Sequence, residues 1–345
     1  MRQTRRSFLK LAGAAGIVAA MGPSLATAAE QQQKSQPAGD RKDLPRGITF
    51  CTLRHDGQYT LGIRTPKGIL EVVRASKILG KSAPATIDEV LQGVDATSLK
   101  AFVDEALASE GLVSAFIAED KAAFGPAVTN PEKIICLGYN YKRHVAEMHI
   151  PTPTSPVLFN KFNNALNYHG GVINLPQSIA KKFDYEVELV VVMGRTARNV
   201  SEADALSYVF GYCTGNDFSA RDLQYKTSQL MLGKTSDGFA PLGPWLVTAD
   251  QIPDPQNLKL ECRVNGETRQ SSNTNDMIFG VKTIISYISQ IWTLKPGDII
   301  FTGTPQGVIF GYPPEKQVWL KPGDQVTTFI EKLGEHRFTL APEKA

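Results

Sequence analysis

The segment DYEVELVVV, residues 184–192, is the most informative stretch of the chain. Its run of β-branched residues predicts a strand, and side chains two residues apart in a strand share a face. Glu186 and Glu188 would therefore project side by side, roughly 7 Å apart at their Cα atoms. Two carboxylates entering an apolar segment repel each other unless a cation lies between them, and Mg²⁺ prefers oxygen ligands of this kind. The alternative is that both glutamates lie on the solvated face of an edge strand.

A second stretch, GYCTGNDFSARDLQ at residues 211–224, is typical of a strand that ends in a loop and continues as a helix. We expect the helix to run from Ser219 to about Leu230. Side chains converge on functional sites at the ends of strands, and Asp217 stands at such an end. The alternative role for Asp217 is the N-cap of the following helix.

A lysine between glycine and threonine in LGKTSD, residues 232–237, invites comparison with a phosphate-binding loop. That motif requires a glycine five residues before Gly233, and Ser228 stands there instead. The phosphate-loop interpretation is therefore excluded. Without further context, Lys234 could be an ordinary solvated lysine.

Two more segments bear polar groups in suggestive places. In GYNYKRHVAE, residues 138–147, a helix starting at Lys142 would place His144 and Glu147 on one face. A carboxylate can hold an imidazole in the tautomer that takes a proton from water, although such pairs also occur as surface contacts. In FTGTPQG, residues 301–307, a strand is expected to end in a tight turn that contains Thr304.

The surrounding pattern predicts a mixed, mainly β fold. Strands at 48–54, 59–64 and 69–73, separated by Asp-Gly and Pro-x-Gly turns, form a small β-meander, and two helices follow it. Further strands are expected at 133–138, 183–193, 209–214, 258–264 and 298–302, with a helix at 281–290. We divide the chain into a signal peptide (1–29), a linker (30–46), a small β-rich domain (47–130) and a catalytic domain (131–345).

The N-terminus has the features of an export signal. Arg5 and Arg6 precede a short apolar run that ends in a small-residue cleavage site at 26–28, and the pattern resembles the bacterial twin-arginine signal. We therefore expect the twin-arginine export machinery as a partner and a periplasmic location. The run is too short to span a bilayer, so no stable membrane anchor is expected.

The charge balance gives no support for a nucleic-acid partner, and the cysteine spacing gives none for a metal cluster or disulfides. Removing the four basic residues of the signal from 37 leaves 33, against 34 acidic residues, which gives no electrostatic case for nucleic acid. The four cysteines are widely spaced, mostly in apolar runs, and form no C-x-x-C pair. We expect them to be buried free thiols.

Taken together and in this order, the five stretches resemble the fumarylacetoacetate hydrolase family over about 200 residues from Lys133. The resemblance implies a mixed β-sandwich roll, a homodimer, and a site that binds Mg²⁺ or Mn²⁺ through Glu186, Glu188 and Asp217. It also assigns catalytic roles to His144, Glu147 and Lys234. Gln224 and Thr304 match the substrate-binding residues of the family.

The activity that the resemblance implies is metal-dependent hydrolysis of a C–C bond in a small 2,4-dioxo acid, through an enolate that the metal stabilises. Oxaloacetate decarboxylation and isomerisation of a 2-hydroxyhepta-2,4-diene-1,7-dioate are alternatives at the same site. An exported binder of 2-oxo acids is the alternative from another class. In many members of the family, T-G-T-P-x-G is followed by V-G, whereas residues 308–314 of this chain read VIFGYPP. Because this loop is bulkier and more apolar, the resemblance does not decide which substrate is used.

Overall fold

Two β-sheets organise residues 43–344, which are the residues that the computed structural model describes. The predicted signal peptide and all of the predicted linker except residues 43–46 lie outside this range. The sheets contain both antiparallel and parallel neighbours; β17 pairs with β5, and β19 with β8, in parallel. The expected mixed, mainly β fold class is confirmed.

The strands are as follows. In spatial order, the ten-stranded sheet contains β4 (Phe116–Ile117), β3 (Gly68–Glu71), β2 (Gln58–Thr65), β1 (Thr49–His55), β14 (Leu246–Thr248), β11 (Val209–Asn216), β10 (Val187–Met193), β17 (Ile299–Phe301), β5 (Ile134–Gly138) and β6 (Val157–Lys161). The five-stranded sheet contains β16 (Glu267–Asn273), β15 (Lys259–Val264), β18 (Gln325–Ile330), β19 (Gly334–Ala341) and β8 (Gly171–Asn174). Two short pairs complete the set: β9 (Phe183–Asp184) with β12 (Ser219–Ala220), and β7 (Leu166–Asn167) with β13 (Ala240–Pro241).

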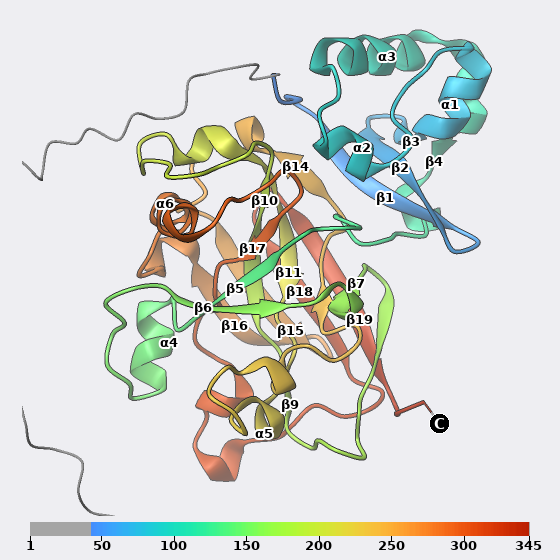
Figure 1. Cartoon of the computed structure of the whole chain (residues 1–345). Coiled ribbons are helices and arrows are strands. Elements are labelled where there is room, and N and C mark those ends of the chain that lie inside the picture. The colour runs from blue at the N-terminus through green and yellow to red at the C-terminus, as the bar shows by residue number, and fades with distance from the viewer. Residues whose placement is uncertain (1–42, 345) are drawn as a thin grey trace, which may run out of the picture. The chain divides into compact units, whose positions relative to one another are not determined.

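The α-helices of the described residues are α1 (Val72–Leu79), α2 (Ile87–Leu91), α3 (Ala96–Ala108), α4 (Lys142–Glu147), α5 (Arg221–Gln224) and α6 (Val281–Ile291). The helices predicted near Thr86, Ser98 and Val281 are confirmed, and the Thr86 side chain caps α2 by accepting from Glu89 N. The sequence pattern missed α1, where the chain leaves β3 and buries Val72 and Ala75 on one helical face. Figure 1 shows α1, α2 and α3 gathered beside strands β1 to β4.

The helix predicted from Ser219 to Leu230 is wrong in extent, because α5 has only four residues. The backbone of Ser219 and Ala220 pairs with β9 instead, and Leu230 adopts a left-handed φ of 65°. A left-handed residue cannot continue an α-helix.

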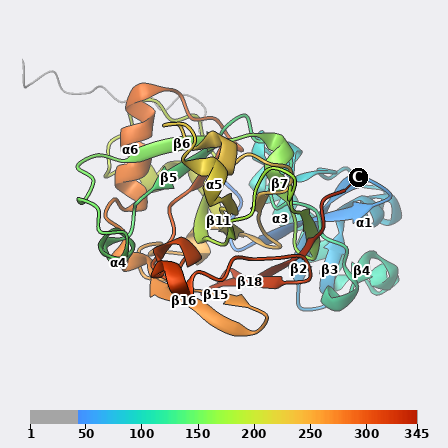
Figure 2. The ribbon, with the colours of Figure 1, turned by 90° about the horizontal axis from the view of Figure 1, so that it is seen from below.

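Strand β10 is buried on both faces, as in the centre of a layered protein. Leu189 and Val191 belong to the core between the two sheets, whereas Val190 and Val192 face a second core beneath α1, α2 and α3. Figure 2 shows the two layers, with β5 and β6 on one side and β15, β16 and β18 on the other. Glu188 precedes Val190 by two residues and lies on the same face of β10, so its carboxylate enters a buried region.

The expected cysteine chemistry is confirmed: all four cysteines are buried and free. Between residues 43 and 344, no helix has the length and apolar character required to cross a membrane.

Candidate active site

Strand pairing brings the three predicted metal ligands together. In the antiparallel pair of β10 and β11, Val187 lies opposite Asn216, so the start of one strand meets the end of the other. The backbone N–H of Asp217 donates to the carbonyl of Glu186 at 2.9 Å. Carboxylate oxygens of Glu186, Glu188 and Asp217 all lie within 4.8 Å of one another.

Burial excludes the simpler alternatives for these residues. Glu186, Glu188 and Asp217 are 6%, 1% and 0% exposed, so neither glutamate lies on a solvated face. Asp217 is not a helix cap, because the N-cap of α5 is Ala220 and no side chain caps that helix.

Lys234 bridges two of these carboxylates. Its Nζ lies 2.8 Å from Glu186 Oε2 and 2.8 Å from Asp217 Oδ2, and the side chain is almost fully buried. Burial alone would lower the pKa of Lys234, but Asp217 and Glu186 raise it above its usual value. Lys234 is therefore a charged member of the site and not a solvated surface lysine.

Two further buried cations complete the charge pattern, and the sequence interpretation assigned a role to neither. Lys161 Nζ at the end of β6 lies 2.6 Å from Asp217 Oδ1 and donates to three backbone carbonyl groups. Arg221 contacts Glu186 Oε1 through Nη1 at 2.7 Å and Asp184 Oδ2 through Nε at 2.9 Å. Arg221 stands inside the quoted N-D-x-S-A-R-D-x-Q pattern, whereas no local signal marks Lys161.

Glu188 differs from its two neighbours in its partners. It accepts a 2.7 Å hydrogen bond from the backbone N–H of Gly303, and it has no ion-pair partner among residues 43–344. Burial and the adjacent Asp217 and Glu186 carboxylates raise the pKa of Glu188 well above its usual range. For Glu186, burial acts in the same direction, but Lys234 and Arg221 lower the pKa to about 2.

The donor set fits a hard divalent cation. Three buried carboxylates offer oxygen ligands at one point, and one of them lacks a compensating positive charge. Mg²⁺ and Mn²⁺ accept such oxygen ligands, and a bound cation would offset the cost of burying these charges together. Glu186, Glu188 and Asp217 are the residues that would hold it.

The predicted His–Glu pair also forms. Helix α4 starts at Lys142, and His144 Nδ1 lies 3.2 Å from Glu147 Oε2. Glu147 in turn accepts from the backbone N–H of Gly307, at 2.9 Å through Oε1. An ideal Cβ on Gly311 would lie 2.3 Å from Glu147 Cδ, so the absence of a side chain there lets the carboxylate approach the loop.

One small cavity is lined by most of the predicted catalytic and substrate-binding side chains, although Glu147, Glu188 and Asp217 are not part of its lining. Its walls include His144, Glu186, Gln224, Lys234 and Thr304. Gln224 Oε1 accepts from Arg221 Nη1, and the Thr304 hydroxyl donates to the carbonyl of Val187 while it accepts from Gln270. The residue that precedes β10 and residues from α4, α5 and the turn after β17 thus meet around a single space.

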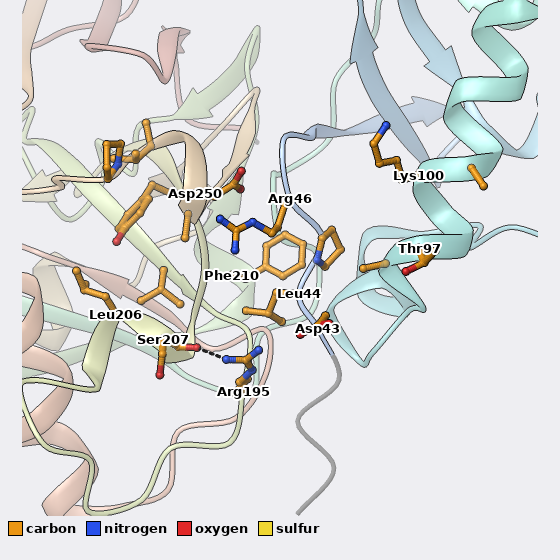
Figure 3. Close-up of a pocket in the computed structure, with 18 of the residues that line it drawn as sticks. Asp43, Leu44, Arg46, Thr97, Lys100, Arg195, Leu206, Ser207, Phe210 and Asp250 are labelled. Atoms are coloured by element: carbon orange, nitrogen blue, oxygen red, sulfur yellow. Dashed lines mark hydrogen bonds between the residues drawn. The ribbon is translucent and has the colours of Figure 1, made fainter. Parts of the chain in front are cut away.

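A larger cavity lies elsewhere, beside α3 and segments 43–46 and 206–212 (Figure 3). Its volume is about 820 Å³, but several of its charged groups interact with nearby protein atoms. Lys100 pairs with Asp104 at 2.7 Å, Asp250 accepts from Gly47 N, and Arg195 donates to the Ser207 carbonyl. We assign the chemistry to the smaller cavity because Glu186, one of the three converging carboxylates, lines it together with His144 and Lys234.

The family assignment follows from comparison with known proteins. The protein-family model described as fumarylacetoacetate (FAA) hydrolase, C-terminal, matches residues 133–341, which is more than half of the chain. The chain therefore belongs to the fumarylacetoacetate hydrolase family, whose members are enzymes.

Curated relatives and solved structures agree with this assignment. The mitochondrial oxaloacetate tautomerase FAHD2A of Bos taurus is 44% identical over 255 residues, covering 73% of this chain and 78% of the relative. A fumarylacetoacetate hydrolase from Exiguobacterium antarcticum has a TM-score of 0.68 and 30% identity, covering 86% of this chain and 100% of its own. A fumarylpyruvate hydrolase from Pseudomonas aeruginosa, in complex with Mn²⁺ and pyruvate, has a TM-score of 0.57 and 31% identity, covering 62% of this chain and 91% of its own.

Proposed function

We propose that this enzyme catalyses keto–enol tautomerisation of oxaloacetate or a closely related 2-oxo dicarboxylic acid. The observation that carries the proposal is a cavity lined by His144, by Glu186 of the carboxylate cluster and by the buried cations Arg221 and Lys234. Glu147 contacts His144 from outside this lining. The name of the Bos taurus relative, at 44% identity, supports oxaloacetate as the substrate.

The three carboxylates would hold a divalent ion, Mg²⁺ or Mn²⁺. When bound, such an ion supplies positive charge that stabilises the enolate form of a 2-oxo acid. The solved relative with Mn²⁺ and pyruvate supports this choice of ion and of ligand class.

A dicarboxylic substrate requires positive charge from the protein itself. Lys234 and Arg221 supply it within the cavity. Arg221 is 4% exposed, and its Nη2 has no hydrogen-bond partner among residues 43–344. A buried guanidinium with a free donor is suited to bind a substrate carboxylate.

Tautomerisation moves one proton between the carbon next to the 2-oxo group and the oxo oxygen, and the carbon skeleton stays intact. With Nδ1 of His144 donating to Glu147, Nε2 has the lone pair that accepts this proton. Glu147 is held by Gly307 N, which keeps the imidazole in that orientation. A positioned histidine of this kind contributes on the order of 10²–10⁴-fold to a proton-transfer rate.

Hydrolysis of the C–C bond of an acylpyruvate is the second candidate. The same His144–Glu147 pair could activate a water molecule for attack on the 4-oxo carbon. The fumarylpyruvate hydrolase among the solved relatives supports this reaction class.

The test compares both reactions on purified, metal-loaded protein whose metal content has been measured. We expect the enol form of oxaloacetate to disappear faster than in buffer containing the same free metal, with slower cleavage of acetylpyruvate. Faster cleavage than tautomerisation would favour the second candidate. Absence of both activities in protein that binds Mn²⁺ would contradict both.

A further inference from the structure

An aromatic side chain forms part of the cavity wall. Phe310, in the short 3₁₀ turn η8 (Ile309–Gly311), lines the cavity together with Tyr225 and Leu230. Its ring stacks on Tyr225 with centroids 5.3 Å apart and an interplanar angle of 24°. The guanidinium carbon of Arg221 lies 5.7 Å from the centre of the Phe310 ring. The Phe310 ring therefore contacts both Tyr225 and the charged side chain of Arg221.

The backbone that bears this ring is fastened to the site. The N–H groups of Ile309 and Phe310 donate to the two carboxylate oxygens of Asp184, at 2.9 and 3.0 Å. Asp184 is fully buried and also pairs with Arg221. On the other side, Gln317 Nε2 donates to the carbonyl of Phe310 at 3.2 Å. These hydrogen bonds fix the backbone of Phe310, and the stack on Tyr225 holds its ring.

The remaining space is small. The cavity encloses about 20 Å³, enough for about one water molecule, so any substrate, oxaloacetate included, requires part of the wall to move. Among the wall residues, Phe310 has its backbone N–H bound to the buried carboxylate of Asp184, so we expect it to stay in place when the site opens. Moving the Phe310 ring to admit extra carbon atoms would break its packing on Tyr225, so each added group costs affinity.

We propose that Phe310 is a specificity-determining residue that restricts this enzyme to short 2-oxo acids of about the size of oxaloacetate. The inference rests on the proposed function for the class of ligand, and it adds the limit on chain length and the residue that sets it. Acylpyruvates with long or aromatic acyl groups are excluded because the Phe310 ring occupies the space they need.

Ligand binding tests the limit independently of turnover. Calorimetry on protein loaded with Mn²⁺ would measure Kd for straight-chain 2-oxo acids from pyruvate to 2-oxooctanoate. We expect the wild-type Kd to rise at least tenfold between the shortest and the longest ligand. Phe310→Ala should remove that rise, and Phe310→Trp should keep it or make it steeper. Val318→Ala, in the same loop region but 75% exposed, is the matched control and should behave like wild type.

Folding is monitored in the same series. If Phe310→Ala unfolds, Phe310→Leu tests the same point, because it removes the stack on Tyr225 but keeps apolar volume. A length dependence that is the same in wild type, Phe310→Leu and Phe310→Ala overturns the inference. A wild type that binds all chain lengths equally also overturns it.

Turnover assays on the same variants distinguish this inference from the proposed function. If the length limit follows residue 310 but no 2-oxo acid is converted, the proposed function fails and the specificity role of Phe310 stands. If oxaloacetate is tautomerised but chain length has no effect in any variant, the function stands and the role of Phe310 is wrong.

Discussion

The backbone N–H of Gly303 donates a 2.7 Å hydrogen bond to Glu188, a buried carboxylate without an ion-pair partner among residues 43–344. Gly303 has a φ of 95°, and a Cβ there would lie 2.8 Å from Asn140 Cβ. Glycine is therefore required at this turn for the N–H to reach the carboxylate. Glu188 therefore has one backbone donor and no cationic side chain as a partner at the point where a cation would bind.

Glu188→Gln should separate metal binding from folding. Removing a charge that its neighbours repel should leave the metal-free protein as stable as wild type or more stable, by about 1 kcal/mol. Added Mn²⁺ should stabilise wild type by about 2.7 kcal/mol at a hundred times Kd, and this gain should vanish in the variant. Chemical denaturation with and without Mn²⁺ measures both effects.

Glu186→Gln is the matched comparison, because the side chain is equally buried but paired. It leaves Lys234 and Arg221 with one carboxylate fewer, so the metal-free protein should lose roughly 3 kcal/mol. Equal stability changes in the two variants would contradict the charge pattern described for this site.

His144→Ala should discriminate between reactions. Tautomerisation and acylpyruvate hydrolysis both need proton transfer, so each should fall on the order of 10²–10⁴-fold. Oxaloacetate decarboxylation needs no base to activate water and should fall much less. Steady-state kinetics on the three reactions measures the difference, and Glu147→Gln should reproduce the pattern more weakly. An equal loss in all three reactions would mean that His144 positions substrate instead.

His336 should make the protein sensitive to acid. It is fully buried beside His169, at a centroid distance of 5.8 Å, and neither of its ring nitrogens has a hydrogen-bond partner among the described residues. Burial, and then the neighbouring His169, hold the pKa of His336 well below 6.5. The folded protein thus favours the neutral ring, and the unfolded chain takes up the proton first as pH falls.

The resulting loss of stability should begin below about pH 6.5 and be absent above it. His336→Phe keeps a ring of similar size and removes the proton site, so it should reduce the loss between pH 7 and pH 4.5 by on the order of 1–3 kcal/mol. Urea denaturation across this range tests the point. An unchanged pH profile would assign the acid sensitivity to other groups.

Replacing Arg5 and Arg6 with lysine tests the proposed export. A receptor reads the arginine pair, so the variant should accumulate uncleaved in the cytoplasm, whereas wild type should be cleaved and periplasmic. Fractionation followed by mass analysis of the N-terminus measures both. Equal periplasmic yield of the two proteins would indicate a different export route or none.

Local sequence patterns predicted what depends on neighbours in the chain. Leu-Lys-Pro-Gly-Asp occurs at 294–298 and 320–324, and both copies form the turn that a Pro-Gly pair favours, with φ of 87° at Gly297 and 91° at Gly323. In each copy the aspartate side chain accepts from the backbone N–H of the lysine three residues earlier. The His144–Glu147 pair belongs to the same class, because a spacing of three on a helix brings the two side chains together.

The sequence by itself thus determined the fold class, the family and the three carboxylates, since strand periodicity and short-range spacing carry that information. The tertiary structure alone decided which distant groups complete the site. Lys161 reaches Asp217 from 56 residues away in the chain, and Gly307 holds Glu147 across 160. It also ended α5 after four residues and placed Phe310 against Tyr225. Such contacts depend on how layers of the fold pack, and packing between segments far apart in the chain leaves no periodic signal in either segment.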